Sequence, residues 1–265
     1  MRILVKLNPQ VDSPYDNDYH YHLQAFVYTL VRESGRAEVH DKLGYKFFCF
    51  SNLFPYRARF QKGGEVKLLI STPDPVVAAD LSRLLREMIG KKRLWIGKLE
   101  FSIVSVDGPL RLKADLGGVV KLRSSTPIII RIPSERYTDY GITSERPYVF
   151  WRETIPLDAF VKQLQDNMEK KILKYGSPDS PLGYRSSPGS EKTGPIPLAE
   201  ILSYRYLKTV SKPITVKGET HQIIGSIWEF EFSPQSKAEA SNLEFAAECG
   251  FGERNSLGFG FVNAL

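Results

Sequence analysis

The sequence is poor in the residues that build metal, redox and disulfide sites. Its 265 residues include two cysteines, Cys49 and Cys249, and four histidines. Neither cysteine belongs to a CxxC pair, and two cysteines are too few to hold zinc together with the scattered histidines. Because both lie in apolar segments, we interpret them as reduced core residues of a cytoplasmic protein. We therefore expect no metal and no cofactor.

Long apolar runs and nucleotide-binding motifs are also missing. We expect no signal peptide, because the first residues precede only a short strand-like run. No stretch approaches the ~20 apolar residues that cross a bilayer. No glycine-rich loop leads into Gly-Lys-Ser/Thr, and no GxGxxG pattern is present. These absences argue against a membrane protein and against a P-loop or dinucleotide-binding enzyme.

The composition indicates a globular, basic protein. Hydrophobic residues make up 42% and aromatic residues 12% of the chain, and lysine plus arginine outnumber aspartate plus glutamate by 36 to 30. The charge of +6 favours a polyanionic partner, although an excess of this size also fits an ordinary basic enzyme. The length fits one large domain or two of roughly 130 residues each.

Hydrophobic periodicity divides the first half into alternating strands and helices. The expected elements are a strand at residues 2–7, a helix from Tyr19, a strand at 45–53, a hairpin of 57–60 with 66–71 closed at Gly63-Gly64, a helix from Asp74-Pro75 to Gly90, and a strand at 93–106. This order is the β-α-β-β-α-β plan of ferredoxin-like and RNA-recognition domains. A boundary at Asp107-Gly108-Pro109 gives a first domain of residues 1–108.

The second half, residues 109–265, repeats this plan with longer loops. The expected elements are strand material at 119–132, a helix at 156–175, a mobile loop at 178–197, strands at 201–209, 214–219 and 220–232 around turns at Lys212-Pro213 and Lys217-Gly218, a helix at 236–248, and a final strand at 258–262. The halves share no visible sequence identity, so the duplication rests on element order. The predicted fold is α+β, with two tandem ferredoxin-like (RRM-like) domains.

The last sixteen residues form a compact glycine-rich tail at 250–265. Two Gly-Phe-Gly triplets frame a short polar segment, and glycine permits positive φ and close backbone approach. Exposed amides beside an arginine suit a phosphate, so one interpretation is a phosphodiester-binding loop. Its candidate residues are Gly250, Gly252, Arg254, Asn255, Ser256, Gly258 and Gly260. A tight turn before the last strand explains the same glycines, and their number does not decide between the two.

Three titratable residues in the first half are candidates for catalysis: Tyr28, His40 and Lys46. They lie on a helix, the loop after it and the next strand, which can converge at one end of a sheet. Tyr28 lies roughly 130° from the centre of its helix's apolar stripe, so we expect it to face away from the core. Cleavage of RNA by its own 2′-hydroxyl needs a base, an acid and a cation at the phosphorane. The alternative is that all three are ordinary surface residues.

The segment of residues 19–22 carries two tyrosines and two histidines. His20 and His22 lie about 200° apart on a helix, so they do not form a metal ligand pair. We interpret the segment as a polar helix entrance whose rings can stack on a base.

The glycine-rich tail resembles the carboxy-terminal loop of the CRISPR-associated Cas-six (Cas6) endoribonucleases, which cut the repeats of precursor CRISPR RNA. Residues 1–7, 21–28 and 43–53 are similar to the archaeal and thermophilic branch of that family. The resemblance runs from end to end and implies two tandem ferredoxin-like domains. The tail is its most specific part.

This resemblance implies a role for each member of the trio. Tyr28 matches the family's helix tyrosine, His40 its acid/base histidine and Lys46 its strand lysine. The implied reaction is metal-independent and leaves a 2′,3′-cyclic phosphate and a 5′-hydroxyl. The implied partner is CRISPR repeat RNA, single-stranded or weakly structured, and a CRISPR effector complex and a homodimer are left open. The alternatives are a repeat-binding protein that cuts poorly or not at all, and a structural subunit of a CRISPR complex.

Overall fold

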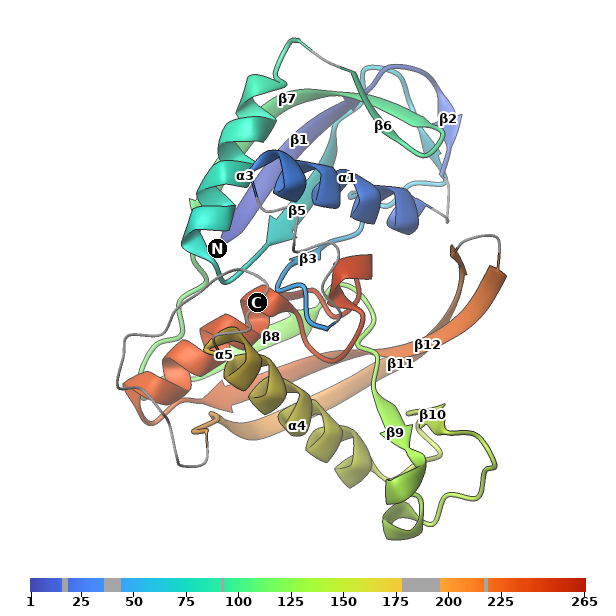
Figure 1. The fold of residues 1–265 in the computed structure, drawn as a ribbon, viewed down its shortest axis with the longest axis vertical. Helices are drawn as coiled ribbons and strands as arrows, with labels where there is room; N and C mark the ends of the chain where they lie inside the picture. Colours follow the sequence, from blue (N-terminus) through green and yellow to red (C-terminus); the bar gives the residue numbers. More distant parts are fainter. Residues whose placement is uncertain (16–18, 36–43, 92, 178–195, 217–218) are drawn as a thin grey trace.

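The computed structural model consists of two α+β units stacked along the long axis of the molecule (Figure 1). It describes residues 1–265 except 16–18, 36–43, 92, 178–195 and 217–218. Both chain ends lie near the level at which the two units meet. Among the described residues, no helix is long and apolar enough to cross a membrane.

The first unit is a five-stranded antiparallel sheet with two helices on one face (Figure 1). Its sheet order is β3-β5-β1-β7-β6. The elements are β1 (Arg2–Pro9), α1 (Tyr19–Glu33), β3 (Cys49–Phe50), β5 (Val66–Ser71), α3 (Pro75–Glu87), β6 (Arg93–Ile96) and β7 (Leu99–Leu110). Leaving out the edge strand β6, this is the predicted ferredoxin-like plan. The predicted alternation of β1 is confirmed, because Ile3, Val5 and Leu7 are buried.

Three local predictions for the first unit are wrong. Residues 57–60 do not form a hairpin with β5; β4 (Arg59–Phe60) pairs with β2 (Ser13–Pro14). Only Cys49–Phe50 of the predicted strand at 45–53 is a strand, since Phe47 has a φ of 51° and turns its side chain toward Tyr175 of the second unit. The predicted strand at 93–106 is the hairpin β6–β7.

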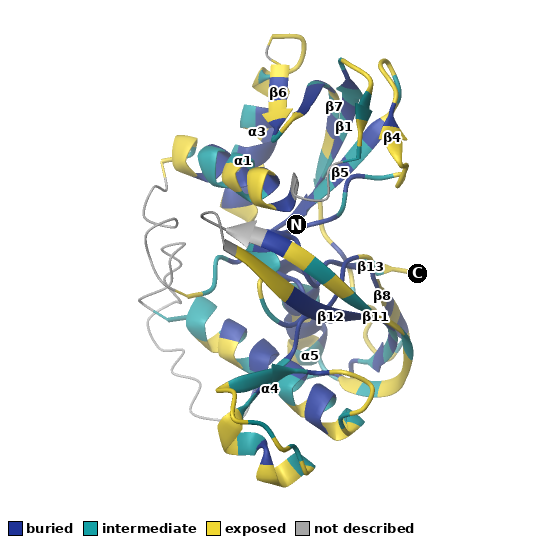
Figure 2. Ribbon diagram, turned by 90° about the vertical axis from the view of Figure 1, so that its right-hand side faces the viewer, coloured by how far each residue is buried: buried dark blue, intermediate teal, exposed yellow. Residues whose placement is uncertain are grey.

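The second unit has the sheet order β11-β12-β8-β13 and again carries its two helices on one face. Its elements are β8 (Val120–Ser124), β9 (Arg131–Pro133), β10 (Tyr148–Phe150), α4 (Leu157–Tyr175), β11 (Glu200–Val216), β12 (Glu219–Ser233), α5 (Lys237–Cys249) and β13 (Val262–Ala264), with short 3₁₀ turns η1 (Ser134–Arg136), η2 (Thr138–Tyr140) and η3 (Asn255–Leu257). In both units the buried residues lie between helices and strands (Figure 2). The predicted fold of two tandem ferredoxin-like domains is therefore confirmed.

Two predictions for the second unit are wrong. β11 passes through Lys212-Pro213 without a turn, because it is an edge strand and a proline there leaves the ladder to β12 intact. The final strand is Val262–Ala264 rather than 258–262, because the glycines before it form the tail loop. The predicted turn at Lys217-Gly218 and residues 178–195 of the predicted loop lie outside the described residues. The boundary after Gly108 stays a prediction; β7 runs on to Leu110.

Candidate nucleic-acid interface

The glycine-rich tail is packed between the two units. Its two Gly-Phe-Gly triplets are joined by a hydrogen bond: the N–H of Phe251 donates to the carbonyl oxygen of Gly260 at 2.8 Å. The N–H of Gly260 donates to Pro127 of the second unit at 2.8 Å. The Cys49 thiol of the first unit donates to the carbonyl of Phe259 at 3.2 Å. The tail is therefore held by both units.

The tail glycines are buried rather than exposed. Gly252 and Gly260 have φ values of 67° and 71°, in the left-handed region. A Cβ at Gly260 would overlap the carbonyl oxygen of Phe251, and one at Gly252 would overlap that of Ile129. These glycines shape the loop by packing on protein backbone. Of the candidate RNA-binding residues, Arg254 is exposed and Asn255 and Ser256 are half-buried. The Asn255 amide donates to the carbonyls of Phe251 and Phe259 at 3.1 and 2.9 Å, so it braces the loop, and the side chains of Arg254 and Ser256 are the ones that the loop presents.

A buried lysine that the sequence analysis missed holds the tail in place. Lys171 of α4 is 2% exposed, and its ammonium donates to the carbonyls of Gly250 and Gly252 and to Asn255 Oδ1, each at 2.7 Å. Burial lowers the pKa of Lys171 to about 8, so the group is still protonated at neutral pH. The available signal was its position three residues after Met168, on the buried stripe of α4.

Tyr28 reaches the tail from α1. Its ring packs edge-on against Phe48, with 5.3 Å between the ring centroids, and its hydroxyl is hydrogen-bonded to Ser256. Gln24, one helical turn earlier, donates to Ser256 Oγ at 3.1 Å. The prediction that Tyr28 faces away from the core is wrong, because Phe48 and the tail cover that side of α1. Burial raises the pKa of Tyr28 above its usual value, so the phenol keeps its proton.

A cleft of 630 Å³ lies beside the tail and is lined by both units. Lys46 lines it from the first unit, and the tail contributes Arg254, Asn255 and Ser256. The structure thus brings Lys46 to the same cleft as Ser256, the hydrogen-bond partner of Tyr28. His40 lies outside the described residues.

The cleft carries more positive than negative charge. Its basic residues are Lys46, Arg131, Lys170, Lys171 and Arg254. Its two acidic residues are neutralised: Asp166 pairs with Lys162 at 2.6 Å, and Glu253 pairs with Arg131. Among the residues that the structure describes, Lys170 and Arg254 take part in no ion pair. Such a cleft suits a phosphodiester backbone.

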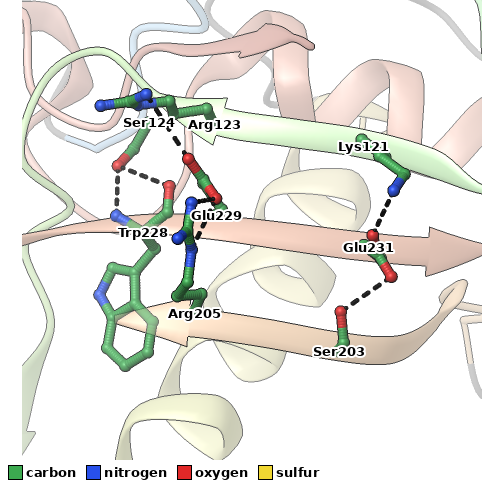
Figure 3. Close-up of polar contacts among 8 residues, drawn as sticks. All are labelled: Lys121, Arg123, Ser124, Ser203, Arg205, Trp228, Glu229 and Glu231. Carbon is green, nitrogen blue, oxygen red and sulfur yellow. Dashed lines mark hydrogen bonds and ion pairs between the residues drawn. The ribbon is translucent and has the colours of Figure 1, made fainter. Parts of the chain in front are cut away.

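The outer face of the second sheet is much less suited to RNA. RNA-recognition domains stack bases on aromatic residues of their sheet. Here carboxylates of β12 bridge the basic residues of the neighbouring strands: Glu229 pairs with Arg123 and Arg205, and Glu231 pairs with Lys121 at 2.6 Å (Figure 3). The carboxylates compensate the charge of these three basic residues and repel phosphate. The cleft on the helical side is therefore the candidate interface.

His20 is part of the core and does not stack on a base as predicted. The ring is 2% exposed and lies parallel to Phe259 at 6.1 Å between centroids. Nδ1 donates to the carbonyl of Leu257 at 3.2 Å, and Lys212 of β11 donates to Nε2. Burial, with the nearby Lys212 charge, lowers the pKa of His20 to about 3 and keeps it neutral. His20 thus joins α1 to the tail and to β11.

Comparison with known proteins gives the family from the sequence and matching folds among solved structures. The family model described as "CRISPR associated protein Cas6, C-terminal" matches residues 111–264. The "CRISPR-associated endoribonuclease Cas6" of Haloferax mediterranei is 28% identical over 100% of this chain and 94% of its own length. The "CRISPR-associated endoribonuclease Cas6 2" of Methanocaldococcus jannaschii is 28% identical over 100% of both chains.

Two solved structures share the fold. One described as "An RAMP protein binding different RNA substrates" has a TM-score of 0.67 at 21% identity, and covers 100% of this chain and 99% of its own. One described as "CRISPR associated protein Cas6" has a TM-score of 0.65 at 19% identity, with the same coverage. Since the family model covers more than half of the sequence, this chain belongs to the CRISPR-associated Cas6 family.

Proposed function

We propose that this protein is an endoribonuclease that cuts CRISPR repeat RNA in precursor transcripts and so yields guide RNAs. The observation that carries the proposal is the basic cleft, which Lys46 and the tail residues 254–256 all line; of these, Ser256 is the hydrogen-bond partner of Tyr28. Relatives that are named Cas6 endoribonucleases and match the whole chain support it.

The proposed reaction needs no metal ion. The 2′-hydroxyl gives its proton to a solvent water molecule, which acts as the base, and attacks the adjacent phosphorus, and the bond to the 5′ oxygen breaks as that oxygen gains a proton. The products are a 2′,3′-cyclic phosphate and a 5′-hydroxyl. His40 donates the proton to the leaving oxygen or assists the base, and Lys46 stabilises the charged phosphorane. Because its pKa is raised, Tyr28 orients the nucleophile by hydrogen bonding rather than deprotonating it.

The two domains have separate tasks in this proposal. Residues 1–108 supply the catalytic trio, and residues 109–265 supply the tail that holds RNA backbone. Arg254 and Ser256 contact the phosphates, while Asn255 and the four tail glycines give the loop its shape. The substrate is single-stranded or weakly structured repeat RNA. Its product passes in the cytoplasm to a CRISPR effector complex.

Incubation of labelled repeat RNA with the protein in EDTA tests the proposal. We expect one specific cut in the repeat and none in an RNA of the same length and permuted sequence. Specific binding without a product would instead indicate a protein that holds repeat RNA without cutting it. Equal binding of the two RNAs, or none, would indicate a structural subunit and contradict the proposal.

A further inference from the structure

The β9–β10 hairpin is an addition to the ferredoxin-like plan. It lies between β8 and α4, where that plan requires only a connection. Its short ladder pairs Arg131 with Phe150 and Tyr148 with Pro133. The hairpin projects beside α4 (Figure 1), and Arg131 and Tyr148 both line the cleft. An element that the fold does not need, placed at the candidate interface, is a candidate for substrate recognition.

Arg131 and Tyr148 form a stack of two flat groups, which we call the Arg131–Tyr148 stack. The guanidinium carbon of Arg131 lies 4.7 Å from the centroid of the Tyr148 ring. The side chain of Arg131 is 37% exposed and Tyr148 is half-buried. An aromatic ring that enters the cleft can extend this stack, since arginine and tyrosine both offer a planar face.

The stack is held in place by the tail. A carboxylate oxygen of Glu253 accepts a hydrogen bond from Arg131 Nε, and the other accepts one from the Arg131 backbone at 3.1 Å. The N–H of Glu253 donates to Ile129 at 2.9 Å. The ring of Phe150 also packs against Tyr148 in an edge-on contact, with 5.6 Å between the ring centroids. Such fixed groups lose little conformational freedom when a ligand binds.

The charge of Arg131 indicates which part of an RNA the stack takes. Glu253 compensates the guanidinium charge, so Arg131 attracts a phosphate less than Arg254 does. What remains is its flat surface beside an aromatic ring, which is the surface that unpaired bases use in protein–RNA complexes. Because Glu253 directly precedes Arg254, the stack adjoins the part of the tail assigned to the RNA backbone.

We propose that the Arg131–Tyr148 stack binds one unpaired nucleobase of the RNA whose phosphates lie on residues 254–256. This inference rests on the proposed function and adds a binding site for a base to it. The base belongs to a nucleotide next to the phosphate that Arg254 contacts. Since every base has a planar face, the site selects an unpaired nucleotide at a fixed place rather than one base type.

An abasic scan of the repeat RNA tests the site. Dissociation constants are measured in EDTA for RNAs that each lack one base and carry a 2′-deoxy group at the cut, with wild type, Tyr148→Leu and Tyr148→Phe. In wild type and Tyr148→Phe, we expect loss of one base to weaken binding by roughly 5- to 100-fold. Tyr148→Leu is expected to bind the intact RNA more weakly than wild type by the same factor. In this variant, loss of the same base is expected to change the dissociation constant by less than about twofold.

Two further variants separate stacking from damage to the fold. Arg131→Lys keeps a positive charge beside Glu253 but removes the planar guanidinium group. In this variant, removal of the same base is expected to weaken binding less than it does in wild type. Tyr204→Leu removes a tyrosine that is 45% exposed on β11 and is expected to keep the wild-type profile. Identical profiles in wild type, Tyr148→Leu and Arg131→Lys would overturn the site and leave the proposed function standing. Failure of wild type to bind the repeat would overturn both.

Discussion

Replacement of His40 by alanine is expected to slow cleavage of repeat RNA by about 10²- to 10⁴-fold, the usual contribution of a positioned acid or base. An imidazole titrates near neutral pH, so it can give a proton to the leaving 5′ oxygen and regain it in each turnover. Alanine removes this group without removing the basic residues that hold the backbone. The affinity for uncut RNA is therefore expected to change less than about threefold.

Single-turnover rates at saturating protein measure this effect, and filter binding measures the affinity. His221→Ala, on β12, is the matched control and is expected to keep the wild-type rate. An unchanged rate in His40→Ala would assign catalysis to another group. A loss of affinity as large as the loss of rate would make His40 a binding residue.

Replacement of Lys171 by methionine is expected to lower the free energy of unfolding by about 2–5 kcal/mol. Methionine fills a similar volume but leaves three acceptors without their donor: the carbonyls of Gly250 and Gly252, and Asn255 Oδ1. Each unsatisfied buried acceptor costs about 1–3 kcal/mol, and removal of a buried charge offsets part of the sum. Denaturant unfolding measures the change. Because the tail then loses its anchor, affinity for repeat RNA is expected to fall as well.

The neighbouring Lys170 provides the matched control. Lys170 is exposed on the same helix and lines the cleft, so Lys170→Met is expected to weaken RNA binding with less than about 0.5 kcal/mol change in stability. Equal stability of Lys171→Met and wild type would show that the tail does not depend on this lysine.

The pH dependence of stability is a second, independent test of the buried charge on Lys171. Burial lowers its pKa from 10.5 to about 8 in the folded protein, so between these values the unfolded chain binds more protons. This group therefore makes stability rise as pH increases through that window, and below it the cost of burying the charge is constant. The groups around Lys171 are Cys49, Cys249, Glu253 and the ring of Tyr45. Lys171→Met is expected to lack the rise.

The parts of the fold that follow from local chemistry were predictable from sequence. β1 alternates because one face is buried, and α3 begins where Asp74 caps it: its carboxylate accepts from the N–H groups of Val76 and Val77 at 2.8 and 2.9 Å. Strand pairing was less predictable, because a two-residue strand such as β4 chooses between partners through long-range packing. Lys212-Pro213 was predicted as a turn because the sequence does not show that β11 is an edge strand.

The candidate site was predictable where the family resemblance covers it and less so elsewhere. The tail was singled out by its glycines, and Tyr28 and Lys46 by their residue types and their places on neighbouring elements; the resemblance then gave each of them a role. Lys171 was missed because a lysine among helical residues resembles a surface charge until its partners are known, and Asn255 lies 84 residues away. Arg131 and Tyr148 were missed for a similar reason. Their hairpin is an insertion, and their contact depends on Glu253 in the tail.

One measurement tests the central claim most directly. Repeat RNA with a single 2′-deoxy group at the nucleotide before the cut is incubated with the wild-type protein in EDTA, beside the all-ribose RNA. Attack by the 2′-hydroxyl predicts that the deoxy RNA binds with unchanged affinity and is not cut, while the all-ribose RNA gives a 2′,3′-cyclic phosphate. Cleavage of the deoxy RNA at the same position, or cleavage of the all-ribose RNA only after magnesium is added, would contradict the account.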